Sequence, residues 1–375
     1  MTARRLRVGL IGTGLIAQVM HLHYLRELSD RFEITALCDI SGENAANNAQ
    51  RYHIAKTFSD WREMVKDDDI DAVFILTSGS HAPIAIAAAK AGKHILVEKP
   101  MCFSVAEGLE MKAAADAAGV TLMVAYPKRY DPAFERFREV ALRVTEPRLM
   151  RVTTFESPFL PYIGHYALAP VAPIPKEAIE NFKAETQASI TRAIGEANPF
   201  LREEYHLVLL DTLVHELNTV RGVLGEPTSL EYVDMQPGQL TVILKFGELS
   251  VSIHWMDLPG ITRYGMEFAL YGPEQRVTLT FPSPFLRSAP ATVEIIEGET
   301  GTTKSRSISE ISSYDSAFKL ELEAFHRCVT TGEAPATSAE DAIHDLALCE
   351  AIIRFVQDPR PITDPSAIPA LASAN

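Results

Sequence analysis

Cysteine is scarce in this chain, and long apolar runs are missing. The 375 residues include four cysteines, none of them in a Cys-x-x-Cys arrangement. This excludes a disulfide framework or a zinc ribbon as the basis of the fold. No apolar run approaches the ~20 residues of a membrane span, and no signal-peptide pattern is visible at the start of the sequence. We therefore expect a cytoplasmic protein with no membrane partner.

Basic residues are in the minority. The chain has 35 lysines and arginines against 49 aspartates and glutamates, which gives a formal net charge of −14. The sequence also has no run rich in lysine and arginine. Because binding along a phosphate backbone needs a basic surface, we expect no nucleic-acid partner.

The first third of the chain alternates short apolar runs with Ala-rich helical patterns. Runs such as "DAVFILT" are almost continuously apolar, as in parallel strands that helices cover on both faces. The alternation predicts βαβ units. We therefore expect an α/β protein whose residues 1–127 form an N-terminal Rossmann domain with a doubly wound parallel sheet.

The pattern changes after residue 127. Residues 157–175 hold five prolines among aromatic residues, which predicts a long loop, and a helix is expected from about 176 to 194. Asn198 and Pro199 begin one long helix that ends before Gly225. Six or seven strands are expected between 228 and 308, with two closing helices behind them. We expect residues 128–357 to form an α+β domain with an open, mostly antiparallel sheet for substrate binding and oligomerisation, followed by a tail at 358–375.

The stretch Gly12-Thr13-Gly14-Leu15-Ile16-Ala17 lies between the first apolar run and the first helical pattern. In a strand-to-helix turn, small residues let a pyrophosphate approach backbone N–H groups at the helix N-terminus. The alternative is a tight turn with no ligand. Asp39 follows the second strand pattern, where a carboxylate accepts hydrogen bonds from an adenosine ribose. That carboxylate would repel a 2′-phosphate, so the sequence predicts NAD rather than NADP.

Three further motifs occur in order along the chain: "TSGSHAPIAIAAAKAGKHILVEKP" with Glu98-Lys99-Pro100 at its end, "AYPKRYDPAF", and Asp211-x-x-x-His215. Together with the glycine turn, they resemble the glucose-fructose oxidoreductase / inositol dehydrogenase / MocA family over nearly the whole chain. The resemblance implies an NAD(P)-dependent oxidoreductase of sugars, cyclitols or related polyols. It also assigns Lys99, Asp211 and His215 to the pocket beneath the nicotinamide, as the catalytic residues.

The chemistry of these residue types agrees with the resemblance. A histidine near neutral pH can remove a hydroxyl proton, and an ammonium can stabilise a developing alkoxide. Asp211 and His215 are four residues apart on the expected long helix, so we expect them to lie on one face, where the carboxylate can orient the imidazole. The alternative is an ordinary solvated pair. No metal site is predicted, because "HELNT" lacks the second histidine of a zinc motif.

The remaining predicted contacts rest on position. The expected cofactor-binding residues are Gly12, Thr13, Gly14, Leu15, Ile16, Asp39, Thr77, Ser78, His81, Glu98, Lys99 and Arg129. The expected substrate contacts are Tyr126, Tyr162, His165, Tyr166 and Glu204. Alternatives are open for several of them: core or surface roles for Tyr126 and Arg129, oligomer packing for the aromatics of 157–175, and a first-turn carboxylate at the helix N-terminus for Glu204.

Three functions are consistent with the sequence. The first is an NAD-dependent dehydrogenase of a sugar, glycoside or cyclitol. The second is an NAD-dependent glycoside hydrolase that oxidises C3 transiently, eliminates the leaving group and returns the hydride. The third is a non-catalytic NAD-binding regulator. A homodimer or homotetramer is expected, because the predicted strands "LTVILKF" and "LSVSIHW" carry apolar residues on both faces, so that the open face of the second sheet would meet another subunit.

Overall fold

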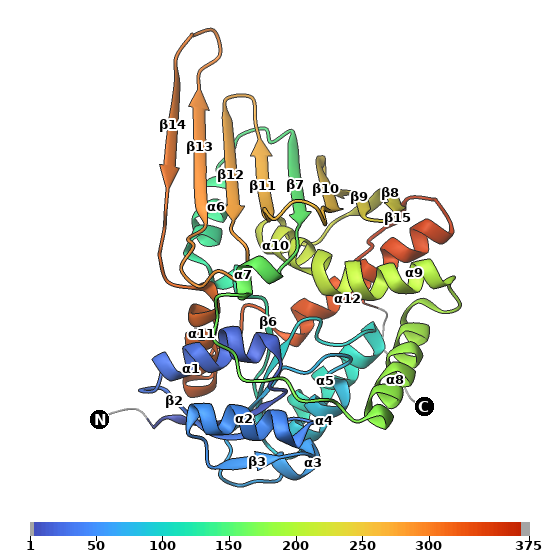
Figure 1. The fold of residues 1–375 in the computed structure, drawn as a ribbon. Coiled ribbons are helices and arrows are strands. Elements are labelled where there is room, and N and C mark those ends of the chain that lie inside the picture. The colour runs from blue at the N-terminus through green and yellow to red at the C-terminus, as the bar shows by residue number, and fades with distance from the viewer. Residues whose placement is uncertain (1–3, 369–375) are drawn as a thin grey trace.

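The computed structural model describes residues 4–368. The part of the chain up to η2, which we call the first half, contains an open sheet of six parallel strands covered by helices (Figure 1). The order β3-β2-β1-β4-β5-β6 reverses direction between β1 and β4, which confirms the predicted doubly wound Rossmann sheet. The strands are β1 (Leu6–Ile11), β2 (Phe32–Cys38), β3 (Lys56–Phe58), β4 (Ala72–Ile75), β5 (His94–Glu98) and β6 (Leu122–Ala125). The three-residue β3 was not predicted, because so short a strand carries almost no hydrophobic pattern.

Helices connect these strands. The first begins with a π-helical segment, η1, and becomes α-helical only four residues after Gln18. Two of the others, α3 and α5, begin where a side chain accepts a backbone N–H: Asp60 accepts from Arg62, and Ser104 accepts from Glu107. The elements are η1 (Ala17–His21), α1 (Leu22–Glu27), α2 (Gly42–Tyr52), α3 (Trp61–Met64), α4 (Ala82–Lys90), α5 (Val105–Ala118) and η2 (Pro127–Tyr130).

The second sheet has nine strands, most of them antiparallel. Its order is β14-β13-β12-β11-β7-β10-β9-β8-β15, and within it β7 and β10 are a parallel pair, so the predicted α/β architecture with a second, mostly antiparallel sheet is confirmed. The strands are β7 (Leu149–Glu156), β8 (Ser229–Gln236), β9 (Gln239–Phe246), β10 (Leu249–Asp257), β11 (Gly265–Tyr271), β12 (Gln275–Phe281), β13 (Thr292–Gly298), β14 (Ser305–Glu310) and β15 (Ile362–Thr363). β15 lies in the predicted tail and pairs with β8.

The helices of the second half lie mainly between the two sheets (Figure 1). The predicted helix from Asn198 to Gly225 is helical throughout, but its middle, η3, is a π-helix. The elements are α6 (Pro132–Ala141), α7 (Leu160–Ile163), α8 (Lys176–Ile194), α9 (Pro199–Glu203), η3 (Glu204–Leu213), α10 (Val214–Leu224), α11 (Ala317–Thr331) and α12 (Ala339–Gln357).

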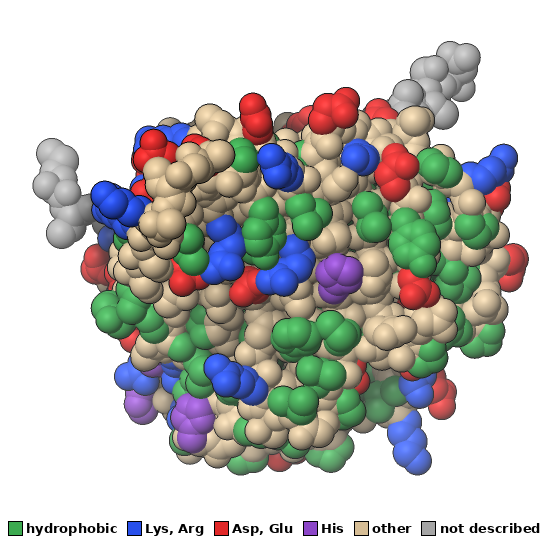
Figure 2. All heavy atoms as spheres, turned by 90° about the horizontal axis from the view of Figure 1, so that it is seen from above, with side chains coloured by type: hydrophobic (Ala, Val, Ile, Leu, Met, Phe, Trp, Pro, Cys, Tyr) green, Lys and Arg blue, Asp and Glu red, His purple; other side chains and the backbone are tan. Residues whose placement is uncertain are grey.

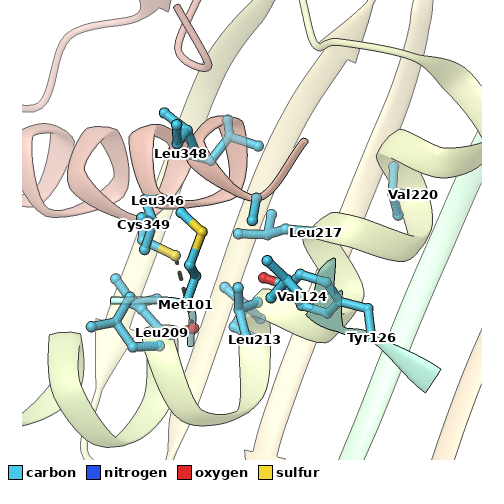
Figure 3. Close-up of a cluster of buried hydrophobic side chains, with 14 of the residues drawn as sticks. Met101, Val124, Tyr126, Leu209, Leu213, Leu217, Val220, Leu346, Leu348 and Cys349 are labelled. Carbon is cyan, nitrogen blue, oxygen red and sulfur yellow. Dashed lines mark hydrogen bonds between the residues drawn. The ribbon is translucent and has the colours of Figure 1, made fainter. Parts of the chain in front are cut away.

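Two buried cores hold the chain together. In one of them, side chains of η3, α10 and α12 interdigitate with Met101, Val124 and Tyr126 of the first half (Figure 3). The other core joins α11 to the first sheet through Leu322 and Phe325. We still propose a domain boundary near residue 127, but the closing helices pack on both sheets, so the two halves share their cores.

The surface carries charges of both signs. On the face seen from above in Figure 1, basic, acidic and apolar side chains are intermixed (Figure 2). The outward residues of β10 are Ser250, Ser252, His254 and Met256, so our premise that this strand is apolar on both faces is wrong. Among residues 4–368, no helix combines the length and apolarity that a bilayer crossing requires.

Candidate cofactor and active site

The glycine turn leads from the end of β1 into η1. Gly12 has a φ of +97°, and a Cβ there would lie 2.7 Å from the carbonyl oxygen of Leu76, so this position needs glycine. Gly14 is exposed, and a Cβ built on it meets no atom within 4 Å. The backbone at Gly14 is therefore open to a bulky anion. Leu15 and Ile16 follow it, partly exposed, at the start of the helical segment.

Asp39 lies beside this turn, directly after β2. Its Oδ2 accepts hydrogen bonds from the N–H and the hydroxyl of Thr13, at 2.9 and 2.7 Å, and its Oδ1 accepts one from the N–H of Ser41. These bonds hold the carboxylate at the edge of the cleft where strands of such sheets bind nucleotides. The residues present therefore fit a dinucleotide with an unphosphorylated ribose.

Asp39→Asn should reduce the preference for NAD over NADP by about tenfold, since it removes the negative charge that opposes a 2′-phosphate while keeping the side-chain size. Dissociation constants of both nucleotides, measured by titration, test this expectation. Asp60→Asn is the matched control, because Asp60 also accepts a backbone N–H at a helix start, but on α3. An unchanged ratio of the two constants in Asp39→Asn would contradict the assignment.

Lys99 follows β5, and its ammonium group contacts Asp211 on the π-helix η3. Nζ donates to Oδ1 of Asp211 at 2.7 Å and to the Asp211 carbonyl oxygen at 2.5 Å. The lysine side chain is mostly buried, whereas Asp211 is 62% exposed. One residue from each half of the chain thus converges at the carboxyl edge of the first sheet.

His215 lies one turn further along the same helix. Its Nδ1 is buried and has no hydrogen-bond partner in the described part of the chain. Burial, with the nearby ammonium groups of Lys128 and Lys99, holds the pKa of His215 well below its usual value. At neutral pH the imidazole is therefore uncharged and able to accept a proton.

The expected contact between Asp211 and His215 needs correction. Asp211 bonds to Lys99, and the imidazole Nδ1 has no partner within residues 4–368. In η3 hydrogen bonds run over five residues rather than four, so residues four apart do not stack as they do on an α-helix. The carboxylate positions the ammonium of Lys99 instead of the imidazole of His215.

Our sequence reasoning missed a buried polar group behind His215. Lys128, on η2, is buried, and burial lowers the pKa of its ammonium, with Glu216 and Glu156 opposing that shift. Glu216 is fully buried, accepts a hydrogen bond from the Thr154 hydroxyl at 2.5 Å, and has a raised pKa because of its burial. A charged residue inside "YPKRYDP" was visible in the sequence, but nothing in the pattern indicated that it is buried.

Two predicted contacts belong to structural packing. Tyr126 is buried in the core among Leu213, Leu217 and Val124 (Figure 3), and the centroid of its ring lies 5.9 Å from that of His215 in a T-shaped arrangement. Arg129 donates to the backbone and side chain of Asn218, and its guanidinium fills the space beside Gly222. These side chains tie η2 to α10, so direct ligand contacts are not supported for either.

His81, in the loop after β4, and Glu98, at the end of β5, form hydrogen bonds to residues around Lys99 and Thr77. Both ring nitrogens of the buried His81 face carbonyl oxygens, of Thr77 at 2.7 Å and of Pro100 at 2.9 Å. This corrects the expected cofactor contact of His81 to a positioning role. Glu98 pairs with His21 at 2.7 Å and accepts from the N–H of Lys99. Ser78 is the exposed residue of this loop.

The aromatics of 157–175 bind other parts of the chain. The Tyr162 hydroxyl donates to the Thr262 carbonyl and accepts from the N–H of Tyr264. The Tyr166 hydroxyl donates to the Phe285 carbonyl, and His165 packs on the Tyr166 ring. Both line a surface hollow with His23, Tyr24 and Arg287 rather than with Lys99.

Glu204, the first residue of η3, is buried, and its Oε2 has no partner in residues 4–368. Burial raises the pKa of this carboxyl group. A substrate contact of Glu204 remains a prediction.

A doubly wound sheet with this glycine turn, this carboxylate and a lysine beside a neutral histidine defines a dinucleotide-dependent oxidoreductase. Two family models match the chain: an oxidoreductase family with an NAD-binding Rossmann fold over residues 6–126, and the C-terminal α/β domain of the same family over residues 207–363. The chain therefore belongs to the Gfo/Idh/MocA oxidoreductase family, and its cofactor is NAD. Residues 127–206 lie outside both models.

Similar proteins match over nearly their whole length. Myo-inositol 2-dehydrogenase of Thermotoga maritima is 23% identical, covering 95% of this chain and 98% of that protein. 1,5-Anhydro-D-fructose reductase of Ensifer adhaerens is 24% identical, covering 93% and 95%. A solved structure of levoglucosan dehydrogenase with NADH and levoglucosan has a TM-score of 0.75 at 19% identity, covering 96% and 100% of the two chains.

Proposed function

We propose that this chain oxidises a hydroxyl group of a sugar, glycoside or cyclitol, with NAD as the hydride acceptor. The contact of Lys99 with Asp211 beside His215 is the observation that carries the proposal. The names of the relatives, which act on inositol, anhydrofructose and levoglucosan, support the substrate class. The nucleotide would be held by turn residues 12–16, by Asp39, and by Thr77 and Ser78 in the loop after β4.

His215 and Lys99 act on the same substrate oxygen in different ways. A neutral His215 accepts the proton of the substrate hydroxyl, since its low pKa leaves a free ring nitrogen at neutral pH. The Lys99 ammonium stabilises the alkoxide character of the same oxygen, and Asp211 holds that ammonium in place. NAD, when bound, takes the hydride from the carbon. We further propose a homodimer or homotetramer as the working form, because the second sheet exposes Phe155 on β7 and Tyr232 on β8.

A panel of free polyols and of aryl glycosides, read at once for NADH and for released aglycone, tests the proposal. We expect NADH to form in proportion to a free polyol consumed. Release of aglycone without net NADH would replace the dehydrogenase by the glycoside hydrolase in which the hydride is returned. Tight NAD binding without reaction on any member of the panel would indicate the non-catalytic regulator.

A further inference from the structure

The segment from Gly164 to Phe182, which we name the strap, runs from α7 along α1 and α2 to α8 (Figure 1). It belongs to the part of the chain that neither family model covers. It also includes Pro170, Pro173 and Pro175, whose fixed φ angles limit the conformations it can adopt when released.

One end of the strap is attached to the glycine turn. The N–H of Ala169 donates to Oε1 of Gln18 at 2.7 Å, and the Nε2 of the same Gln18 donates to the carbonyl oxygen of Thr13 at 3.1 Å. The N–H of Ala172 donates to Oδ1 of Asn44 at 2.6 Å, in the first turn of α2. Gln18, Ala169 and Ala172 are all buried, so this end lies against the helices that follow β1 and β2.

The other end is attached at the loop after β4. The ring of Phe182 lies so close to Gly79 that a Cβ there would be 2.5 Å from its Cε2 atom. Further along α8, the Ser189 hydroxyl donates to Glu107 at 2.6 Å, and the other oxygen of Glu107 accepts from Ser80. The carboxylate of Glu107 thus joins α8 to the loop that ends β4.

One attachment is therefore beside the elements that follow β1 and β2, and the other is at the loop that follows β4. In a doubly wound sheet the nucleotide lies outside the carboxyl ends of the strands, and the acidic residue after the second strand marks the ribose. We propose that residues 172–182 cross the mouth of the cleft between Asp39 and Gly79, and that the strap must open for NAD to enter or leave. Cofactor exchange is then slow compared with that of an uncovered cleft. This inference rests on NAD binding by the family and not on the substrate.

The dissociation of NADH tests the proposal without any substrate. Protein loaded with NADH is mixed with excess NAD, and the fluorescence decay gives the dissociation rate constant. Phe182→Ala should raise this constant about tenfold, with a similar rise in the association rate constant, because opening precedes both steps. Ile179→Ala is the control, since Ile179 is an exposed residue on the same helix.

A second pair of variants leaves the sequence of the strap unchanged, and one of them displaces Phe182 from outside. Gly79→Ala should also speed NADH dissociation by displacing Phe182, whereas Gly92→Ala, with a similar positive φ but no atom within 4 Å of its Cβ, should not. Hydrogen exchange of residues 164–182 should slow when NADH is added. Equal dissociation rate constants of NADH in wild type and Phe182→Ala, or hydrogen exchange unaffected by NADH, would overturn the proposal. Neither result depends on whether the chain turns over a polyol.

Discussion

Replacing Lys99 by methionine is expected to lower kcat by about 10²–10³, the usual cost of removing one donor that stabilises a developing oxyanion. The methionine keeps the length and the apolar body of the side chain but removes the ammonium that contacts Asp211. The affinity for NAD should change little, because most of the proposed nucleotide contacts come from the glycine turn, Asp39, Thr77 and Ser78 and not from Lys99. Steady-state kinetics with the substrate found in the panel, together with NADH titration, measure both quantities.

Lys90→Met is the matched control, because Lys90 lies exposed at the end of α4. Its kcat should equal that of the wild type. If Lys99→Met instead retained more than about half of the wild-type kcat, or lost NAD binding along with turnover, the role of Lys99 at the reacting oxygen would have to be abandoned.

Asp345→Ala should lower the free energy of unfolding by about 3 kcal/mol, since removing one partner of a buried ion pair leaves the other charge uncompensated. Asp345 is fully buried, accepts from Arg221 at 2.6 Å and from Asn218 at 2.7 Å, and so joins α12 to α10. In Asp345→Ala, Arg221 keeps Glu226 and Asp341 as partners. We therefore expect a loss in the free energy of unfolding near the lower end of the ~3–5 kcal/mol typical of a broken buried ion pair.

The pH of that measurement matters. Burial raises the pKa of Asp345 to about 6, with Arg221 opposing the shift. A carboxyl whose pKa rises on folding favours the folded state most at low pH, and that contribution disappears as the pH increases through 6. Urea unfolding is therefore measured at pH 8, where the group is ionised in both states. Asp315→Ala, at an exposed aspartate, serves as the comparison, and a loss below about 1 kcal/mol in Asp345→Ala would show that the network is dispensable.

The sequence predicted the architecture because the relevant patterns are local. Continuous apolar runs, the glycine turn and the caps of the helices each occupy a few neighbouring residues, and residues 176–194 form a helix with the predicted bounds. Even the seven strands between 228 and 310 follow from alternation and turn residues.

What the sequence could not indicate depends on contacts between distant segments. Arg129 was expected to bind the cofactor, but in the structure it donates a hydrogen bond to Asn218, which is 89 residues away in the sequence. Lys128 is likewise buried near residues of β7 and α10, far from it in the sequence. The π-helical turn of η3 left no recognised signal in the sequence, yet it determines that Asp211 bonds to Lys99 and not to His215. The approach of Lys99 to the long helix could therefore be predicted, whereas the pairing of the side chains there could not.

The widened turn in η3 also limits what can be transferred from relatives by alignment. A relative whose helix is α-helical throughout would need fewer residues to span the ten-residue η3. Counting backwards from its aspartate would then misplace the earlier positions, by about 100° around the helix axis for each residue of difference. The counterpart of Glu204 in such a relative would be a different side chain on a different face. Residues that determine substrate preference in this family should therefore be compared by superposing the structures of this helix, and not by sequence alignment alone.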